Sequence, residues 1–334
     1  MDVRALVKVM RSGDVRARLS AVREAQASVR QATVAAGLHT GVLEVLAGGA
    51  ATVEEVAGRV RATDLALLRA FLEVLATTGV VSRTGDRFGL TRRGRAVLED
   101  SVVRATYTAF SDFHTGLYRD LGTQLAGGPG RDDVTRRATV IAELSEAMQP
   151  FSDALLREVV TERRPDHVLD VGCGTGRQLA TMLEAAPSAH GVGIELDPES
   201  AELARRHLTD RGVAARAQVL AGDALALLPD VGPVDLVLLA NVVYYVPVDE
   251  RVDLFRAVHA RIRPGGAVVV ISTALRDDSF SRHFDLLLRA QQGRMELPDM
   301  RVLAGQLREA GFVPGGPRRI MYGDPLTAVV ADRP

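Results

Sequence analysis

The spacing of apolar residues changes near the middle of the chain. In the first part, apolar positions recur at helical spacing, which predicts helices over about 15–48, 52–60 and 64–77. Thr52 opens the second of these as a capping box, and Asp64 can cap the third. In the second part, apolar runs of strand length alternate with helical stretches. The pattern therefore predicts a mainly helical domain followed by an α/β domain.

A β-hairpin is expected directly after the predicted helices. Val80–Ser82 and Arg87–Leu90 are strand-like runs on either side of a Thr-Gly-Asp turn signal, and another helix starts at Thr91. Helix, helix and hairpin in this order predict a winged helix over residues 1–105. Residues 106–150 are expected to form a helical connector, interrupted by a glycine-rich turn.

Parallel strands are expected in the second domain, over residues 151–334. Because helical stretches separate the strand-length runs, consecutive strands should be parallel and covered by helices on both faces of the sheet. This is a Rossmann-like α/β fold behind a mainly α-helical winged-helix domain. The predicted strands are His167–Val171, Gly191–Leu196, Ala217–Ala221, Val234–Ala240 and Ala267–Ser272.

The composition limits the class of partner. Of 334 residues, 47% are hydrophobic and 25% charged, and 41 basic side chains nearly balance 42 acidic ones. Such a chain is globular and has no overall field that would attract nucleic acid or an anionic membrane, so a neutral small molecule fits better. No apolar run approaches the ~20 residues of a membrane span. With one cysteine and no signal peptide, the chain is expected in the cytoplasm.

A glycine-rich loop stands where the first predicted strand meets a helix. Gly172, Gly174 and Gly176 let the backbone turn sharply and approach a ligand, and the helix start offers free N–H groups. By itself this is also the pattern of a tight strand-to-helix turn. Two acidic residues extend it. Glu195 ends the second strand, where a carboxylate can accept hydrogen bonds from ribose hydroxyls, and Asp223 ends the third. Either could instead cap a helix.

With these motifs, roughly residues 150–334 resemble the class I S-adenosylmethionine (SAM)-dependent methyltransferases. The resemblance rests on Asp170-x-Gly-x-Gly-x-Gly176, Glu195-x-Asp-Pro198, Gly222-Asp-Ala224 and Arg263-Pro-Gly-Gly266, in the family's order and spacing. It implies an enzyme with SAM as cofactor. It further implies that the methionine part of SAM is surrounded by Asp170, Gly172 and Gly174, with Gly176 in the same loop. By the same resemblance, Glu195 binds the ribose and Asp223, beside Ala224, binds the adenine. Asn241 is then expected at the cofactor's edge. Asp197 is the alternative ribose ligand.

The whole chain resembles the larger bacterial and plant O-methyltransferases, which place a winged-helix domain before the SAM domain. That resemblance implies a homodimer built largely by the N-terminal domain, which also helps to close a pocket for a small-molecule acceptor. The subfamily carries a His-Asp pair after the fourth strand, and its histidine deprotonates an acceptor hydroxyl. Here Tyr244 and Tyr245 stand in those places, and Ser272-Thr273 replaces a supporting carboxylate.

A phenol with a pKa near 10 is a poor base at neutral pH, so Tyr244 and Tyr245 are expected to shape or orient the acceptor. C- or N-methylation of an already nucleophilic acceptor is therefore favoured over base-assisted O-methylation, and SAM-fold chemistry without methyl transfer is a further alternative. For O-methylation, the candidate replacement bases are His114 and His283, whose segments could both fold over the pocket.

Polar residues on one later segment are candidate acceptor ligands. Arg289 and Gln292 lie on a stretch that resembles the subfamily's substrate-lining helix and could bind an acidic or polar acceptor. An amphipathic helix with solvated polar residues is the simpler explanation. No His-x-x-x-His motif or carboxylate cluster predicts a metal site.

Two other functions compete with methyl transfer. A DNA-binding regulator is disfavoured, because Ala51–Asp100 carries eight arginines against seven acidic residues and the helix after Asp64 is mostly apolar. A nicotinamide-dependent oxidoreductase is disfavoured as well. Its usual loop is Gly-x-Gly-x-x-Gly, whereas the spacing here is Gly-x-Gly-x-Gly.

Overall fold

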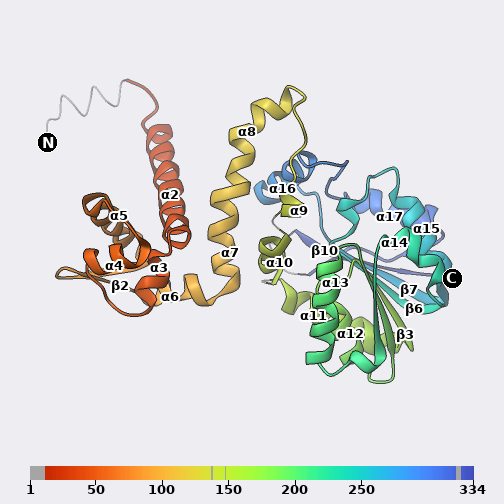
Figure 1. Ribbon diagram of the computed structural model, residues 1–334. Coiled ribbons are helices and arrows are strands. Elements are labelled where there is room, and N and C mark those ends of the chain that lie inside the picture. The colour runs from red at the N-terminus through yellow and green to blue at the C-terminus, as the bar shows by residue number, and fades with distance from the viewer. Residues whose placement is uncertain (1–11, 137, 147, 321–324) are drawn as a thin grey trace. The chain divides into compact units, whose positions relative to one another are not determined.

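The computed structural model describes residues 12–136, 138–146, 148–320 and 325–334. These residues form two compact units. Figure 1 colours the chain by residue number, from red at the N-terminus to blue at the C-terminus. The first unit takes those of Met1–Gly122 and Val134–Ala147, and the second takes those of Thr123–Asp133 and Met148–Pro334. The segment predicted as a connector is thus shared between the two units.

The first unit is mainly helical. Its antiparallel hairpin pairs β1 (Val81–Thr84) with β2 (Arg87–Leu90), and buried side chains such as Leu43, Leu72 and Phe88 form its core. No helix in the described ranges is long and apolar enough to cross a membrane. The helices of this unit and its boundaries are α2 (Val15–His39), α3 (Val42–Ala47), α4 (Val53–Val60), α5 (Leu65–Thr77), α6 (Arg92–Glu99), α7 (Ser101–Ala109), the π-helical turn η1 (Phe110–His114), α8 (Thr115–Leu125), α9 (Asp133–Arg136) and α10 (Ala138–Glu146).

The predicted caps of this unit are confirmed. Thr52 and Glu55 form the capping box of α4, since each side chain accepts the backbone N–H of the other residue. Asp64 accepts the N–H of Leu67 at the start of α5, at 2.9 Å. Local hydrogen bonds of this kind satisfy the free N–H groups of a helix start, which is why the sequence reveals them.

The prediction of one continuous helix over 15–48 is wrong. The helix ends at His39, and α3 begins at Val42. Gly41 between them has a φ of 74°, a left-handed conformation that interrupts the helical hydrogen bonds. Helical spacing of apolar residues continues across this break, so the pattern alone did not reveal it.

The second unit is built on a mixed sheet. Its described strands follow the order β5-β4-β3-β6-β7-β10-β8, with β9 paired to β10. Strands β3 to β7 are parallel, so β3, in the middle, is where the strand order reverses. In such folds ligands bind beyond the carboxyl ends of the strands at this reversal. The strands are β3 (His167–Val171), β4 (His190–Glu195), β5 (Ala217–Ala221), β6 (Val234–Ala240), β7 (Ile262–Thr273), β8 (Val313–Pro314), β9 (Arg318–Arg319) and β10 (Leu326–Asp332).

The predicted parallel strands are all present, and β3, β5 and β6 have the predicted bounds. The expectation of a parallel sheet is incomplete, because β10 runs antiparallel to β7, β8 and β9. In the described part of the chain, the short strands β8 and β9 lie between α17 and β10, so the alternation of strands and helices did not identify β10.

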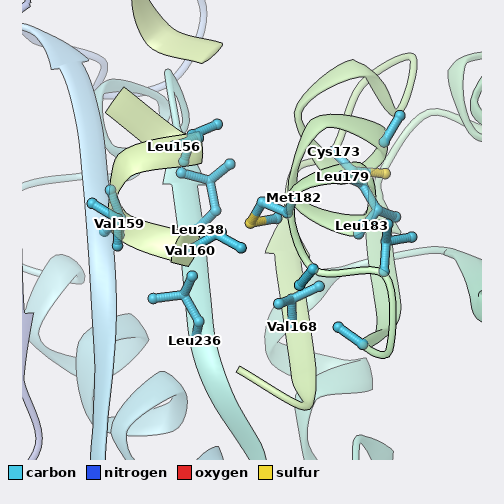
Figure 2. Packing of buried hydrophobic residues seen from close by; sticks show 14 of the residues in the cluster. Leu156, Val159, Val160, Val168, Cys173, Leu179, Met182, Leu183, Leu236 and Leu238 are labelled. Atoms are coloured by element: carbon cyan, nitrogen blue, oxygen red, sulfur yellow. The ribbon is translucent and has the colours of Figure 1, made fainter. Parts of the chain in front are cut away.

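Alternate residues of the central strands point into two apolar layers. Val168 and Leu238 pack with α11, α12 and α13 on one face, as Figure 2 shows for α11, α12, β3 and β6. Leu169 and Leu239 pack with α15 and α17 on the other. The helices and helical turns of this unit are α11 (Gln149–Arg163), α12 (Arg177–Ala185), α13 (Pro198–Asp210), η2 (Ala214–Arg216), α14 (Ala224–Leu227), η3 (Leu228–Asp230), η4 (Val243–Tyr245), α15 (Arg251–Arg261), α16 (Ser279–Arg289) and α17 (Met300–Glu309).

Candidate functional site

The glycine-rich loop leaves β3 and leads directly into α12. Gly172, Gly174 and Gly176 have φ angles of 71°, 53° and 75°, a region that other residues rarely adopt. A Cβ on Gly172 would lie 2.4 Å from a methyl of Val242, and one on Gly176 would lie 3.1 Å from Ala204 of α13. A Cβ on Gly174 would meet no atom within 4 Å. The loop is therefore tightly packed at both ends and open at its centre.

Asp170 is a buried carboxyl group on β3, just before this loop. The N–H of Leu179 donates to the carboxylate, but Oδ2 has no hydrogen-bond partner in the described part of the chain. Burial, reinforced by the negative charge of Glu195, raises the pKa of Asp170 to about 7. A cationic ligand would stabilise the ionised form of this carboxyl group and lower its pKa again.

Glu195 ties the end of β4 to the glycine-rich loop. Its Oε2 accepts the N–H of Gly174 at 2.8 Å, and its Oε1 accepts the N–H of Asp197 at 3.0 Å. Each carboxylate oxygen keeps a further lone pair for a ligand. Asp197 itself is exposed and caps α13, where its Oδ2 accepts the N–H and the hydroxyl of Ser200.

Asp223 follows β5 and caps the short helix α14, whose backbone N–H donates to Oδ1 at 3.1 Å. Ala224 beside it is half-buried. Two leucines near the acidic residues are strongly exposed, Leu196 by 69% and Leu225 by 47%. Apolar and carboxylate groups at neighbouring strand ends suit a flat heterocycle with polar edges. Neither leucine was singled out from the sequence, although each lies one or two residues after an acidic residue at a strand end, which was a usable signal.

The end of β6 lies beside the same loop. Asn241 has a φ of 57°, and its N–H donates to Ile271 at 2.7 Å. A left-handed conformation at a residue other than glycine costs free energy, and such residues cluster at functional sites. Val242 then fills the space that a side chain on Gly172 would need. The segment after β6 is therefore held directly against the glycine-rich loop.

Tyr244 and Tyr245 lie in η4, immediately after this contact. The Tyr244 side chain is buried, with its ring 4.5 Å from that of Tyr245 and 5.7 Å from that of Phe284, between centroids. Burial and hydrogen bonding to Tyr245 raise the pKa of Tyr244 well above 10. Burial also raises the pKa of Tyr245, against a lowering by its hydrogen bond to Tyr244, and the charge of Glu195 raises it further.

The two candidate histidines lie in different units. In the first unit, His114 is buried in the π-helical turn η1, with its ring stacked on Phe110 and Phe113 at centroid distances of 4.2 and 4.4 Å. In the second, His283 is half-buried on α16, one residue before Phe284, and burial lowers its pKa. A lowered pKa leaves a histidine neutral at pH 7 and able to accept a proton.

Arg289 and Gln292 have partners within the second unit. Arg289 forms ion pairs with Asp285, at 2.8 Å, and with Glu296, at 2.7 Å. Gln292 is exposed, its backbone N–H donates to Arg131 at 2.7 Å, and its side chain donates to Gly130 at 3.4 Å. Two carboxylates therefore already neutralise the positive charge of Arg289.

These residues fit one kind of ligand. The unpartnered oxygen of Asp170 calls for a cation, Gly174 leaves room for it, and Glu195 can accept hydrogen bonds from hydroxyl groups. Within the described residues, no group of histidine, cysteine and acidic side chains is arranged to hold a metal ion. A cationic nucleoside with a free ribose matches this combination of charge, space and acceptors.

Comparison with known proteins identifies the family. A family model described as a methyltransferase domain matches residues 168–266, the stretch that contains the loop, both strand-end carboxylates and η4. Erythromycin 3''-O-methyltransferase of Saccharopolyspora erythraea is 30% identical over 232 residues, which cover 65% of this chain and 70% of that protein. The chain belongs to the SAM-dependent methyltransferases.

Relatives of this methyltransferase are named for transfer to different atoms. N,N-dimethyltransferase OxyT of Streptomyces rimosus is 25% identical over 317 residues, 88% of this chain and 90% of that protein. Indolepyruvate C-methyltransferase of Streptomyces griseus is 26% identical over 255 residues, 72% of this chain and 73% of that protein. Membership of the family therefore leaves open which atom of the acceptor receives the methyl group.

The fold of the methyltransferase matches solved structures over nearly its whole length. The structure of mitomycin 7-O-methyltransferase MmcR superimposes with a TM-score of 0.77 at 23% identity, and the match covers 96% of this chain and 100% of that one. The N-terminal helical unit is thus part of the shared fold. SAM is the cofactor, and when bound it supplies a methyl group on a sulfonium that departs as a neutral thioether.

Proposed function

We propose that this methyltransferase transfers a methyl group to a carbon or nitrogen of a small natural-product acceptor that is already nucleophilic. The observation that carries the proposal is the state of Tyr244, at the position where the resemblance to the O-methyltransferases implies a basic histidine. Its phenol is buried, with a pKa well above 10, so it cannot take a proton from an acceptor hydroxyl at neutral pH.

The cofactor-binding roles follow from the contacts of the second unit. Asp170 would stabilise the ammonium of the methionine part across the open centre of the loop at Gly174. Glu195 would accept hydrogen bonds from the ribose, and Asp223 would accept one from the adenine amino group. Exposed Leu196 and Leu225 would cover the faces of the adenine, which supports placing it between β4 and β5.

The reaction is then an in-line displacement. The lone pair of a neutral amine, or the electron pair of an enol carbon, forms a bond to the methyl carbon while the carbon–sulfur bond breaks. S-adenosylhomocysteine (SAH) leaves, and the new product loses its extra proton to water. Alignment of donor and acceptor supplies much of the rate, so no general base is needed before transfer.

A second candidate is O-methylation with His283 as the base. This histidine is half-buried on α16 and has a lowered pKa, and the ring of the next residue, Phe284, packs on Tyr244. Its burial and neutral state are what a base for a hydroxyl acceptor requires. The two candidates differ in which single substitution stops methyl transfer.

Tyr244→Phe is expected to keep the rate of methyl transfer within about tenfold across pH 6–9, because the buried phenol carries no proton to or from the acceptor, whereas loss of a true base costs about 10²–10⁴. The measurement is SAH release in single turnover with matched acceptors, namely a phenol, an arylamine and a 2-oxo acid. The amine or the oxo acid should be methylated. Preference for the phenol, together with a thousandfold loss in His283→Gln, would instead establish the second candidate.

We also propose that the first unit forms a homodimer and does not read DNA. Apolar side chains are exposed along α2, at Leu19, Val22 and Val29, and along α5, at Leu67 and Val74. Repeated exposed apolar residues on a helix are typical of an interface with another chain. A helix that reads DNA would present basic and amide groups instead.

Leu19→Glu combined with Val29→Glu is expected to convert the dimer into a monomer, because both charges would be buried at the interface. Light scattering coupled to size-exclusion chromatography would measure the mass. The matched control is Leu203→Glu with Val302→Glu, which places two charges at exposed apolar positions of the second unit. A wild-type chain that is monomeric at micromolar concentration would contradict the proposal.

A further inference from the structure

Arg251 is an arginine buried in the second unit. It lies on the first turn of α15, and only 2% of its surface is exposed. Arginine is almost never fully buried unless hydrogen bonds and opposite charges compensate for the loss of water. Its partners therefore indicate what the side chain does.

The partners of Arg251 are backbone carbonyl groups of two separate segments. Its Nε donates to Val246 at 3.0 Å, and its Nη2 donates to Glu296 at 2.7 Å. The N–H of Glu296 in turn donates to the carbonyl of Tyr244 at 3.2 Å. The carbonyl groups of Tyr244 and Val246, one on each side of Tyr245, are thus fixed to one framework. This framework consists of Arg251 and the backbone of Glu296.

A second set of contacts holds Glu296 in place from α16. The Asp285 side chain is buried, and its Oδ1 accepts the N–H of Leu297 at 3.0 Å. Asp285 Oδ2 and Glu296 Oε2 both bind Arg289, at 2.8 and 2.7 Å. Burial lowers the pKa of Arg251, but the charges of Glu296 and Asp285 raise it. Two guanidinium groups and two carboxylates therefore compensate one another.

This framework adjoins the cofactor site. Val242, at the start of the same segment, lies against Gly172 of the glycine-rich loop, where even a Cβ would approach it to 2.4 Å. At the other end of the segment, the negative charge of Glu195 raises the pKa of the Tyr245 phenol. A displacement of the segment would therefore move Tyr245 relative to groups that bind SAM.

We infer that Arg251 is a positioning residue, which holds the Tyr245 side chain beside the cofactor through the carbonyls of Val246 and Glu296. The inference rests on the proposed function only in treating Tyr245 as part of the acceptor site. Asp285 and Arg289 support the same arrangement by fixing Glu296 and Leu297. Arg289 then belongs to this framework and does not serve as a free receptor for an acidic acceptor.

The test uses the full chain with tyrosine labelled at the ζ carbon with ¹³C. The chain has five tyrosines, whose resonances are assigned by single Tyr→Phe variants. In the wild type, SAH should shift the resonance of Tyr245. In Arg251→Met, the resonances of Tyr244 and Tyr245 should be displaced or broadened before SAH is added, and the SAH-induced shift of Tyr245 should fall at least threefold. The dissociation constant of SAH, measured by calorimetry, should change less than threefold.

The matched control is Arg256→Met, which removes an exposed arginine of the same helix that pairs with Asp253 and Glu309. It should leave both tyrosine resonances unchanged. Arg251→Lys keeps the charge but reaches one carbonyl, so it should displace the resonances less, and it replaces the Met variant if that variant fails to fold. Unchanged tyrosine resonances in both Arg251 variants, with a normal SAH response, would overturn the inference. An absence of any Tyr245 response to SAH in the wild type would count against the proposed acceptor site instead.

Discussion

Asp170→Asn is expected to stabilise the cofactor-free protein at pH 8 and to weaken cofactor binding. Burial and the charge of Glu195 raise the pKa of Asp170 from 3.8 to about 7 in the folded chain. Above pH 7 the folded state must therefore hold a buried, unpaired carboxylate, whereas an unfolded chain leaves the same group in water. Asparagine has no charge to bury, so the variant avoids this cost.

The sign and the pH range follow from linkage between proton binding and folding. Because the folded pKa lies above the unfolded one, the contribution of Asp170 to stability is complete below about pH 4 and is lost as the pH rises through about 7. Three pKa units correspond to about 4 kcal/mol, which is the upper limit of the effect. The difference in unfolding free energy between variant and wild type should grow from near zero below about pH 4 to about 2–4 kcal/mol at pH 8.

The measurements are urea unfolding without cofactor at several pH values and calorimetric titration with SAH at pH 7.5. The ammonium of SAH should bind the variant about 10- to 100-fold more weakly, because a hydrogen bond to a charged group is worth about 1.5–3 kcal/mol. Asp166→Asn is the control, since it removes an exposed carboxylate just before β3. A variant that loses stability at pH 8 would contradict the unpaired state of Asp170.

Glu195→Gln should have the second large effect, again on cofactor affinity. The carboxylate oxygens of Glu195 accept the N–H groups of Gly174 and Asp197. The substitution removes the negative charge and replaces one of these acceptor oxygens by an amide donor. Both the loop geometry and the proposed ribose contacts depend on this carboxylate. We expect SAM and SAH to bind about 10- to 100-fold more weakly by calorimetry.

The same variant carries an internal check. The negative charge of Glu195 contributes to the raised pKa of Asp170, so the pKa of Asp170 should fall in Glu195→Gln. Titration of ¹³C-labelled aspartate carboxyl groups would measure it. Glu199→Gln, two residues beyond the cap of α13, is the matched control and should change neither quantity. Undiminished SAH affinity in Glu195→Gln would show that the ribose binds elsewhere.

Elements set by contacts close in sequence were predictable. The capping box of Thr52 and Glu55 and the cap at Asp64 were recognised because donor and acceptor lie three residues apart. Gly172 and Gly176 were recognised because a left-handed backbone needs glycine there. The bounds of β3 and β6 were recognised because a strand buried on both faces is apolar at nearly every position.

Features set by contacts distant in sequence were not predictable. Arg289 was interpreted as a possible acceptor ligand, and nothing in the residues around it revealed that Glu296 would share its charge with Asp285. The burial of Arg251 was not predicted, because its hydrogen bonds run to carbonyl groups 5 and 45 residues away in the sequence. The antiparallel β10 needs a partner, β7, more than 50 residues earlier.

The sequence by itself determined the family, the cofactor and the parallel strands β3 to β7, because each rests on residue types at short fixed spacings. It also led to the prediction that Tyr244 stands where the resemblance implies a basic histidine. Only the tertiary structure decided the states of those groups. The pKa of Asp170 is raised to about 7 and that of Tyr244 well above 10, mainly because neighbours from other strands and helices exclude water around them. Burial and charge depend on what packs against a side chain, and that is determined only when the whole chain has folded.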